Sequence, residues 1–195
     1  SGARVLVTGG TGYVGAFLCR ALAEREDVKE VIAVVRASDD DKAAQRLRGN
    51  CEARLGEIGD WYSKIRAVAG KLDAENFGLS TDLVETLDVV VHGAAEVNMV
   101  KPPSLLEASN VGGTKLAAEL ALRAKAPLLF TSTMLPLEGE APTGYRLSKD
   151  AAEKVLEAAA RDVGAVCCTV QIGDLGFARR KGATLPEDDA LVVLL

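Results

Sequence analysis

Two side chains that could transfer a proton, Tyr145 and Lys149, lie four residues apart in the sequence. On a helix this spacing places a phenol and an ammonium on the same face, one turn apart. A nearby cation stabilises a phenolate, so we expect Lys149 to lower the pKa of Tyr145 and suit it to proton transfer near neutral pH. Upstream, an apolar run ends in Thr131-Ser132-Thr133, where a hydroxyl could hydrogen-bond the carbonyl oxygen of a substrate.

A cluster of glycines near the N-terminus has the spacing of a phosphate-binding turn. Gly9, Gly12 and Gly15 follow the apolar run 4–8 and precede a helical pattern at 13–25. In such a unit the first glycine permits the tight turn, the second lets the backbone approach a pyrophosphate, and the third lets the helix pack on the strand. The helix N-terminus adds free N–H groups and the positive end of its dipole. The pattern predicts a dinucleotide site; the alternative is a glycine-rich turn without a ligand.

The residue after the second predicted strand, 31–35, indicates which dinucleotide is bound. NAD-binding domains usually carry an acid there, which hydrogen-bonds the ribose hydroxyls. This sequence has Arg36 instead, and a guanidinium matches a 2′-phosphate, so the sequence favours NADP(H). Arg46, on the following helix, could add a second contact. The alternative for both residues is an arginine exposed to solvent.

Short apolar runs alternate with longer helical patterns along the chain. The runs are apolar throughout rather than at every second residue, which indicates strands buried on both faces, and the helices between them supply the crossovers. The sequence therefore predicts an α/β fold with a Rossmann-type, doubly wound parallel sheet. We expect strands at 4–8, 31–35, 65–69, 88–92, 127–131 and 165–172, and helices at 13–25, 39–55, 105–126 and 144–161.

Composition excludes several kinds of function. The 195 residues include 23 Lys and Arg against 28 Asp and Glu, a net charge of −5, which argues against a basic surface for nucleic acid or a membrane. One histidine, His92, rules out sites of two or three imidazoles, and we expect it in the core rather than as a proton shuttle. No apolar run nears the roughly 20 residues of a membrane span. We expect reduced, mostly buried thiols in a cytoplasmic protein without a metal site, at Cys19, Cys51, Cys167 and Cys168.

Together these motifs resemble a known family. The glycine turn, the hydroxyl at the end of the fifth strand and the Tyr-x-x-x-Lys pattern are similar to those of extended short-chain dehydrogenases/reductases. Finer signatures resemble the terminal thioester reductase domains of nonribosomal peptide and polyketide synthases, carboxylic acid reductases and aminoadipate reductases. These signatures are Val35-Arg36-Ala37 with Ala44-Gln45-Arg46-Leu47, Gly70-Lys71-Leu72 with Phe77-Gly78-Leu79-Ser80, His92-Gly93-Ala94-Ala95-Glu96-Val97-Asn98, and Asn110-Val111-Gly112-Gly113-Thr114.

The resemblance covers about residues 4–177 and implies an activity. In that family NADPH reduces an acyl or peptidyl thioester, held on the phosphopantetheine arm of a carrier protein, and releases an aldehyde and sometimes an alcohol. The partner expected here is therefore a carrier protein, in the same polypeptide. We expect an NADP(H)-binding domain at 1–178, the start of a largely missing substrate-binding portion at 179–195, and a monomer when the domain is excised.

The resemblance also implies roles for individual residues. Thr133 is expected to polarise the substrate carbonyl, Tyr145 to donate the proton, and Lys149 to hold the nicotinamide ribose and tune Tyr145. The residues expected to bind the cofactor are Gly9, Thr11, Gly12, Tyr13 and Val14 at the phosphates, Arg36 and Arg46 at the 2′-phosphate, Leu72 at the adenine, and Gly93, Ala94 and Ala95 beneath the dinucleotide, with Tyr145 and Lys149 at the ribose.

The sequence departs from the family pattern at three places. Lys71 stands where the family usually has an acid, Gln171-Ile172-Gly173 replaces the more usual Arg-Pro-Gly, and the segment between Thr133 and Tyr145 is short. Two other functions remain open. One is a different extended short-chain reductase or a nucleotide-sugar epimerase, and the other is a reductase-like release or sensing domain without redox activity.

Overall fold

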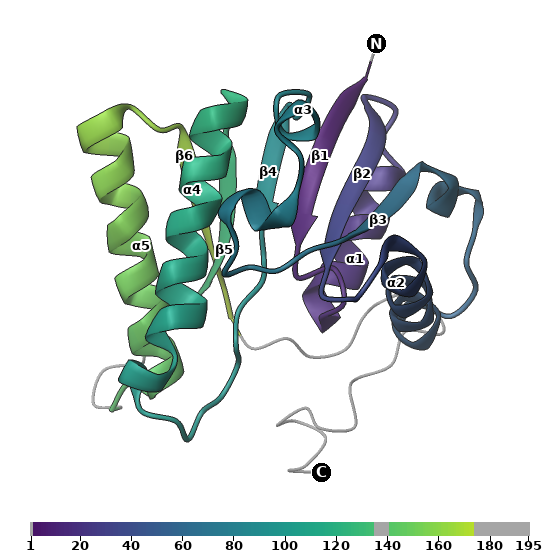
Figure 1. Cartoon of the computed structure of the whole chain (residues 1–195). Coiled ribbons are helices and arrows are strands. Elements are labelled where there is room, and N and C mark those ends of the chain that lie inside the picture. The colour runs from purple at the N-terminus through teal and green to yellow at the C-terminus, as the bar shows by residue number, and fades with distance from the viewer. Residues whose placement is uncertain (1, 135–140, 174–195) are drawn as a thin grey trace.

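The computed structural model describes residues 2–134 and 141–173, and within them one parallel sheet forms the centre of the molecule (Figure 1). Its six strands lie in the order β3-β2-β1-β4-β5-β6, and every pair of neighbours is parallel. Their bounds are β1 Ala3–Thr8, β2 Val28–Val35, β3 Ile65–Ala69, β4 Val89–His92, β5 Leu128–Thr133 and β6 Cys167–Ile172. The Rossmann-type, doubly wound sheet predicted from the sequence is confirmed.

Helices cover both faces of this sheet. The helices α1 (Tyr13–Ala23) and α2 (Asp40–Leu55) pack on one face, and α3 (Thr81–Val84), α4 (Gly113–Ala124) and α5 (Gly144–Val163) pack on the other. Three 3-10 helices, Asp60–Lys64, Glu75–Gly78 and Pro103–Leu105, and one π-helix, Glu107–Gly112, lie in the connections. No helix within 2–134 and 141–173 is long and apolar enough to cross a membrane.

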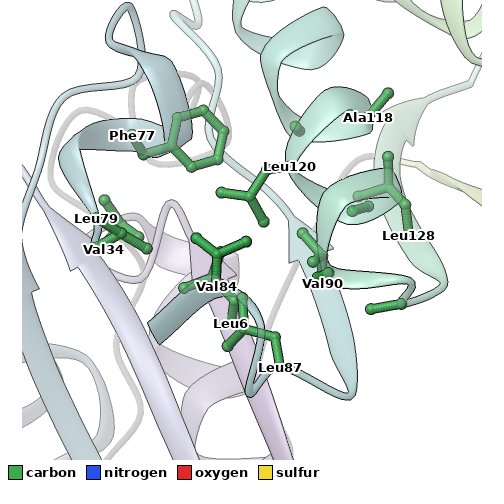
Figure 2. Packing of buried hydrophobic residues seen from close by; sticks show 14 of the residues in the cluster. Leu6, Val34, Phe77, Leu79, Val84, Leu87, Val90, Ala118, Leu120 and Leu128 are labelled. Atoms are coloured by element: carbon green, nitrogen blue, oxygen red, sulfur yellow. The ribbon is translucent and has the colours of Figure 1, made fainter. Parts of the chain in front are cut away.

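Alternate residues of each central strand enter different cores, because side chains alternate across a strand. Leu6 and Phe130 pack with α4 and α5 in one buried cluster, part of which is seen in Figure 2. Val5 and Val7 pack with α1 and α2 in the other cluster. The strand order reverses between β1 and β4, and an open α/β sheet binds ligands at the carboxyl ends of the strands beside this point.

The predicted helix at 105–126 is divided in the structure. A 3-10 turn at Pro103–Leu105 and the π-helix Glu107–Gly112 precede α4, which begins only at Gly113. Within this stretch the carbonyl of Asn110 accepts a hydrogen bond from the hydroxyl of Thr114, at 2.7 Å. The apolar pattern did not reveal this break, because a π-helix is a short local irregularity within a stretch that remains helical.

Strand β6 corrects two predictions. It was expected to be buried on both faces, yet four of its six residues are exposed, because it is the outermost strand of the described sheet. All four cysteines are free thiols, as expected, and Cys19 and Cys51 are buried. The expectation of burial is wrong for Cys168, which is exposed on β6, and Cys167 is half-buried.

Candidate active site

The glycine turn after β1 brings a helix N-terminus directly against the strand. Gly9 has a φ of 80°, and its carbonyl accepts a hydrogen bond from the Gly12 N–H at 2.9 Å. A Cβ on Gly15 would lie 2.0 Å from the Gly9 carbonyl oxygen, so no other residue fits there. No side chain among the described residues caps α1, which leaves N–H groups of its first turn, at Tyr13 and Val14, free for an anion.

Helix α2 braces this turn and the end of β2 with two side chains one helical turn apart. Arg46 donates a hydrogen bond from Nη1 to the carbonyl of Arg36 at 2.7 Å. Asn50 directs its Nδ2 toward the carbonyls of Gly10 and Gly12, both at 3.4 Å. The structure thus places Arg46 beside Arg36, whose side chain is exposed. Asn50 was missed from the sequence, although its spacing from Arg46 on the predicted helix was a usable signal.

Backbone from β1 and β4 is in direct contact where the strand order reverses. A Cβ on Gly9 would lie 2.7 Å from both the Ala94 nitrogen and the Gly93 carbonyl oxygen. The Gly93 N–H donates to the Thr8 carbonyl and the Ala94 N–H to the Thr8 hydroxyl, both at 3.2 Å. The structure therefore brings the predicted phosphate turn and the predicted 93–95 floor together. Leu72 lies apart from them, after β3, where it is partly buried against the core.

His92 is a core residue, as predicted. It is fully buried, its Nδ1 lies 2.7 Å from the Thr8 hydroxyl, and its ring is stacked between Phe77 and Phe130. Burial and, to a smaller extent, the charge of Lys149 together lower its pKa to about 3. The imidazole is therefore neutral, and its Nε2 has no hydrogen-bond partner among the described residues.

The three residues predicted to act on the substrate lie on β5 and α5, and α5 begins beside the edge of the sheet at which β5 ends (Figure 1). Thr133 is the last residue of β5, and Tyr145 and Lys149 lie in the first turns of α5, which begins beside that edge. Thr143 caps this helix, since its hydroxyl accepts from the Arg146 N–H at 3.2 Å. Tyr145 and Thr133 are half-buried, whereas Lys149 is only 2% exposed.

The protonation of this pair differs from the sequence prediction. Burial raises the pKa of Tyr145, so the expected lowering by Lys149 is wrong. The Nζ of Lys149 lies 3.9 Å from the centre of the Phe130 ring instead of pairing with the phenol. Burial also lowers the pKa of Lys149 to about 8, and the charge of Glu153 opposes this shift. At neutral pH Tyr145 is thus a protonated phenol and Lys149 is largely an ammonium.

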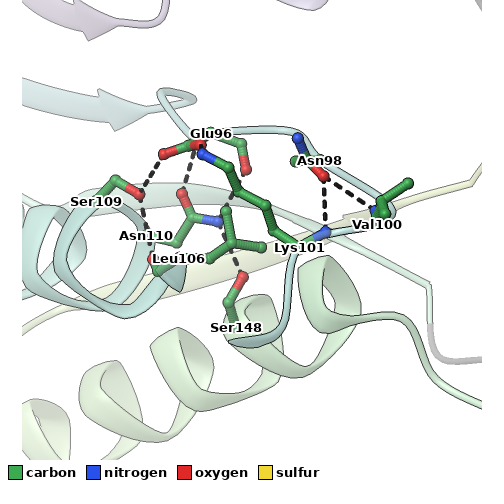
Figure 3. Close-up of polar contacts among 8 residues, drawn as sticks. All are labelled: Glu96, Asn98, Val100, Lys101, Leu106, Ser109, Asn110 and Ser148. Atoms are coloured by element: carbon green, nitrogen blue, oxygen red, sulfur yellow. Dashed lines mark hydrogen bonds and ion pairs between the residues drawn. The ribbon is translucent and has the colours of Figure 1, made fainter. Parts of the chain in front are cut away.

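Asn110 connects the site loops, and sequence reasoning identified it only as part of a family signature. Its Oδ1 accepts from the Glu96 N–H at 2.7 Å, and its Nδ2 donates to the Glu96 carbonyl at 3.1 Å and to the Ser148 hydroxyl at 2.9 Å (Figure 3). Ser148 in turn donates to the carbonyl of Tyr145 at 2.7 Å. Asn110 is 2% exposed. One amide on the π-helix thus joins the loop after β4 to the helix that carries Tyr145 and Lys149.

The loop after β4 forms a wall beside the start of α5. A Cβ on Gly144 would lie 2.1 Å from the Lys101 carbonyl oxygen, and the Thr143 hydroxyl contacts the Met99 sulfur at 3.8 Å. The ammonium of Lys101 pairs with the carboxylate of Glu96 (Figure 3), which lowers the pKa of that carboxyl. The charges of this wall therefore compensate one another.

The sheet order, the glycine turn and the Tyr-x-x-x-Lys helix define a Rossmann-type dinucleotide-binding domain of the extended short-chain dehydrogenase/reductase class. The chain belongs to the NAD-binding family described as Male sterility protein, whose model matches residues 7–141. The family resemblance predicted from the motifs is confirmed by the relatives that follow.

Two curated relatives are reductases in name. The chain is 37% identical over 151 residues to the glycine betaine reductase of Emericella nidulans, and this match covers 70% of this chain and 12% of the relative. It is also 37% identical over 141 residues to the L-2-aminoadipate reductase of Schizosaccharomyces pombe, and this match covers 70% of this chain and 10% of the relative. A solved terminal R domain from the myxalamid PKS-NRPS pathway has a TM-score of 0.88 at 30% identity, over 98% of this chain and 54% of that one. The chain thus spans about a tenth of these curated relatives and about half of the solved domain.

Proposed function

We propose that this chain is the cofactor-binding part of an NADPH-dependent reductase that releases an acyl or peptidyl thioester from a carrier protein as an aldehyde. The observation that carries the proposal is the buried Lys149, one helical turn from a protonated Tyr145, at the edge where the glycine turn meets the 93–94 backbone. The names of the two curated relatives and of the myxalamid domain support the same reaction class.

The residues present fit a dinucleotide. Gly9, Gly12 and Gly15 leave a cradle that a Cβ would fill, and the first-turn N–H groups of α1 suit a pyrophosphate. In this proposal Thr11, Tyr13 and Val14 complete the phosphate site, Leu72 borders the adenine, and Gly93, Ala94 and Ala95 lie beneath the dinucleotide.

The end of β2 favours NADPH over NADH. The exposed guanidinium of Arg36 stands where a 2′-phosphate would lie, and the hydrogen bond from Arg46 to the Arg36 carbonyl fixes the backbone at that point. A guanidinium binds a phosphate through two parallel hydrogen bonds, whereas the two hydroxyls of NADH offer it no charge. Arg46 adds a second positive charge at the same place.

Three side chains would act on the substrate. When bound, NADPH supplies a hydride to the thioester carbonyl carbon. The Thr133 hydroxyl donates a hydrogen bond to the carbonyl oxygen, and Tyr145, whose pKa is raised by burial and which is protonated at neutral pH, donates its proton to that oxygen as negative charge develops. Lys149 stabilises the phenolate that remains and hydrogen-bonds the ribose. Loss of the thiol from the resulting hemithioacetal leaves the aldehyde.

The carrier protein would belong to the same polypeptide. The curated relatives are about ten times longer than the stretch that this chain matches, which leaves room for further domains in proteins of this kind. A thioester on a phosphopantetheine arm can reach a site in a neighbouring domain, because the arm and the linker move the reacting group over a long span. We place this partner upstream of the reductase.

The experiment uses the parent protein that contains this chain, with NADPH and an acyl thioester on its carrier domain. The expected result is loss of NADPH absorbance together with one aldehyde, trapped and identified by mass spectrometry, per acyl group. Release without NADPH would favour the domain without redox activity, and conversion of a nucleotide sugar without net NADPH loss would favour the epimerase. If NADPH is consumed neither with carrier-bound thioesters nor with coenzyme A thioesters, the proposal is contradicted.

A further inference from the structure

Lys149 is an ammonium buried without an anionic partner. It is 2% exposed, and among the residues that the structure describes it makes no hydrogen bond and no ion pair. Burial makes an ammonium costly, and because the charge of Glu153 offsets this cost only in part, the pKa of Lys149 is lowered to about 8. The group that the Nζ contacts is instead the Phe130 ring, whose centre lies 3.9 Å away.

Phe130 is the end of a column of three stacked rings. Its ring lies 5.8 Å from that of His92 with an interplanar angle of 14°, and His92 lies 6.2 Å from Phe77 with an angle of 11°. Phe130 and Phe77 are both fully buried. His92 is fixed through its Nδ1 to Thr8, which also holds the Ala94 backbone. The Phe130 ring is therefore held nearly parallel to a fixed, neutral imidazole, and the Lys149 ammonium lies over it.

We propose that Phe130 is a positioning residue for Lys149, because the face of its ring binds the buried ammonium and holds it at the site edge, where no carboxylate of the described residues pairs with it. A cation above an aromatic face is attracted by the ring quadrupole, more strongly when both groups are removed from water. An aliphatic residue at 130 would fill the core equally well but would offer no such attraction. The role of Lys149 toward the cofactor rests on the proposed function; the contact with Phe130 does not.

Other ionisable groups around Lys149 do not replace this contact. The carboxylate of Glu153, one turn further along α5, accepts hydrogen bonds from Gln171 of β6 at 3.2 and 3.3 Å. Tyr145, one turn before, is a neutral phenol, and His92 of β4 is neutral. A protonated His92 would repel the ammonium through the ring, so its burial as a neutral imidazole is part of the same arrangement. Asn110 of the π-helix, which hydrogen-bonds Ser148 of α5, carries no charge, and Glu107 of the same helix is exposed.

The test measures the pKa of Lys149 directly, by NMR titration of protein labelled with ¹³Cε lysine, the signal being assigned from its loss in Lys149→Arg. Replacement of Phe130 by fluorinated phenylalanines preserves the shape of the ring and weakens its negative face with each added fluorine. We expect the pKa of Lys149 to fall stepwise, by about one unit for the trifluoro ring. Phe130→Leu should lower the pKa of Lys149 by a similar amount, whereas Phe130→Tyr should leave it near the value in the unchanged protein.

The matched control is the same series of fluorinated rings at Phe77, which belongs to the same column, is equally buried and does not touch Lys149. In the Phe77 series the pKa of Lys149 should stay unchanged. An unchanged pKa in the Phe130 series, or an equal fall in both series, would overturn the inference. Because the titration needs neither NADPH nor substrate, it succeeds or fails independently of the proposed reductase activity, and the ring series keeps the test valid if Phe130→Leu fails to fold.

Discussion

Burial raises the pKa of the Tyr145 phenol, and the ammonium of Lys149, four residues later, lies over the ring of Phe130. Sequence spacing predicted the pair but not this geometry, since the position of the Lys149 ammonium depends on Phe130, which lies on a different element. A proton donor for the reduction direction needs its proton at working pH. The raised pKa therefore suits donation to the developing oxyanion rather than abstraction of a proton.

Replacing Tyr145 by Phe removes that proton and little else. We expect NADPH consumption with the thioester to fall by at least about a hundredfold, the usual contribution of a positioned general acid. The Kd for NADPH, measured by fluorescence titration, should change less than about threefold, because the ring and Lys149 stay in place. A variant with normal turnover would show that the proton comes from another group.

Arg36→Ala tests the choice of cofactor. The loss of a charge-assisted contact should weaken NADPH binding by roughly 1.5–3 kcal/mol and leave NADH binding nearly unchanged. Isothermal titration with both cofactors measures the two losses. The matched control is Arg48→Ala on α2, whose guanidinium pairs with Glu52, away from the end of β2. Equal weakening for NADPH and NADH in Arg36→Ala would show that no 2′-phosphate is bound there.

The helices and strands differ in how well the sequence predicted them. The run 31–35 lies within β2, because a short, continuous apolar run rich in β-branched residues favours a buried strand. The helix at 105–126 was predicted as continuous, although a π-helix at Glu107–Gly112 interrupts it. The reason is that the interruption is stabilised by Asn110, whose partners Glu96 and Ser148 are distant in sequence. Local patterns carry no information about such partners.

Asn110→Ala removes the connection between the loop after β4 and α5. The Glu96 N–H and carbonyl would lose their partner, so the free energy of unfolding should fall by about 1–3 kcal/mol in urea titrations. The rate of thioester reduction should fall as well, because the first turns of α5 lose a contact. Asn98→Ala is the control, since Asn98 accepts only from Val100 and Lys101 in an exposed loop. Similar losses in both variants would mean that Asn110 merely fills space.

At the scale of the whole molecule, the sequence predicted the fold class and the edge of the sheet where the candidate residues meet. It did so because the carboxyl ends of parallel strands share one edge, whatever the details of packing. The bracing of the glycine turn by Asn50 and the stacked column around His92 could not be predicted. The first depends on how close α2 lies to the turn after β1, and the second on how the segment of Phe77 packs against β4 and β5. Only the packed molecule determines these distances.

Acid should destabilise the fold through the single histidine. The folded pKa of His92 is about 3, and an unfolded histidine has a pKa of about 6.5, so the unfolded chain binds a proton that the folded chain does not. The free energy of unfolding therefore falls as pH drops below about 6.5, by up to about 1.4 kcal/mol for each pH unit. Urea unfolding from about pH 7.5 down to about pH 4.5 measures this slope. In His92→Leu the fall in the free energy of unfolding with each pH unit should be smaller by that amount. An equal fall in both proteins would contradict the low pKa of the buried His92.

Backbone contact between Gly9 and the 93–94 segment has a consequence for how a cofactor enters. Since main chain touches main chain there without an intervening side chain, the phosphate cradle cannot rearrange separately from the sheet. It is preorganised, and association then loses little conformational entropy in the protein backbone. Binding should accordingly be rapid and should bring only a small loss of amide hydrogen exchange in β1 and β4, with the ordering confined to the long, exposed side chain of Arg36.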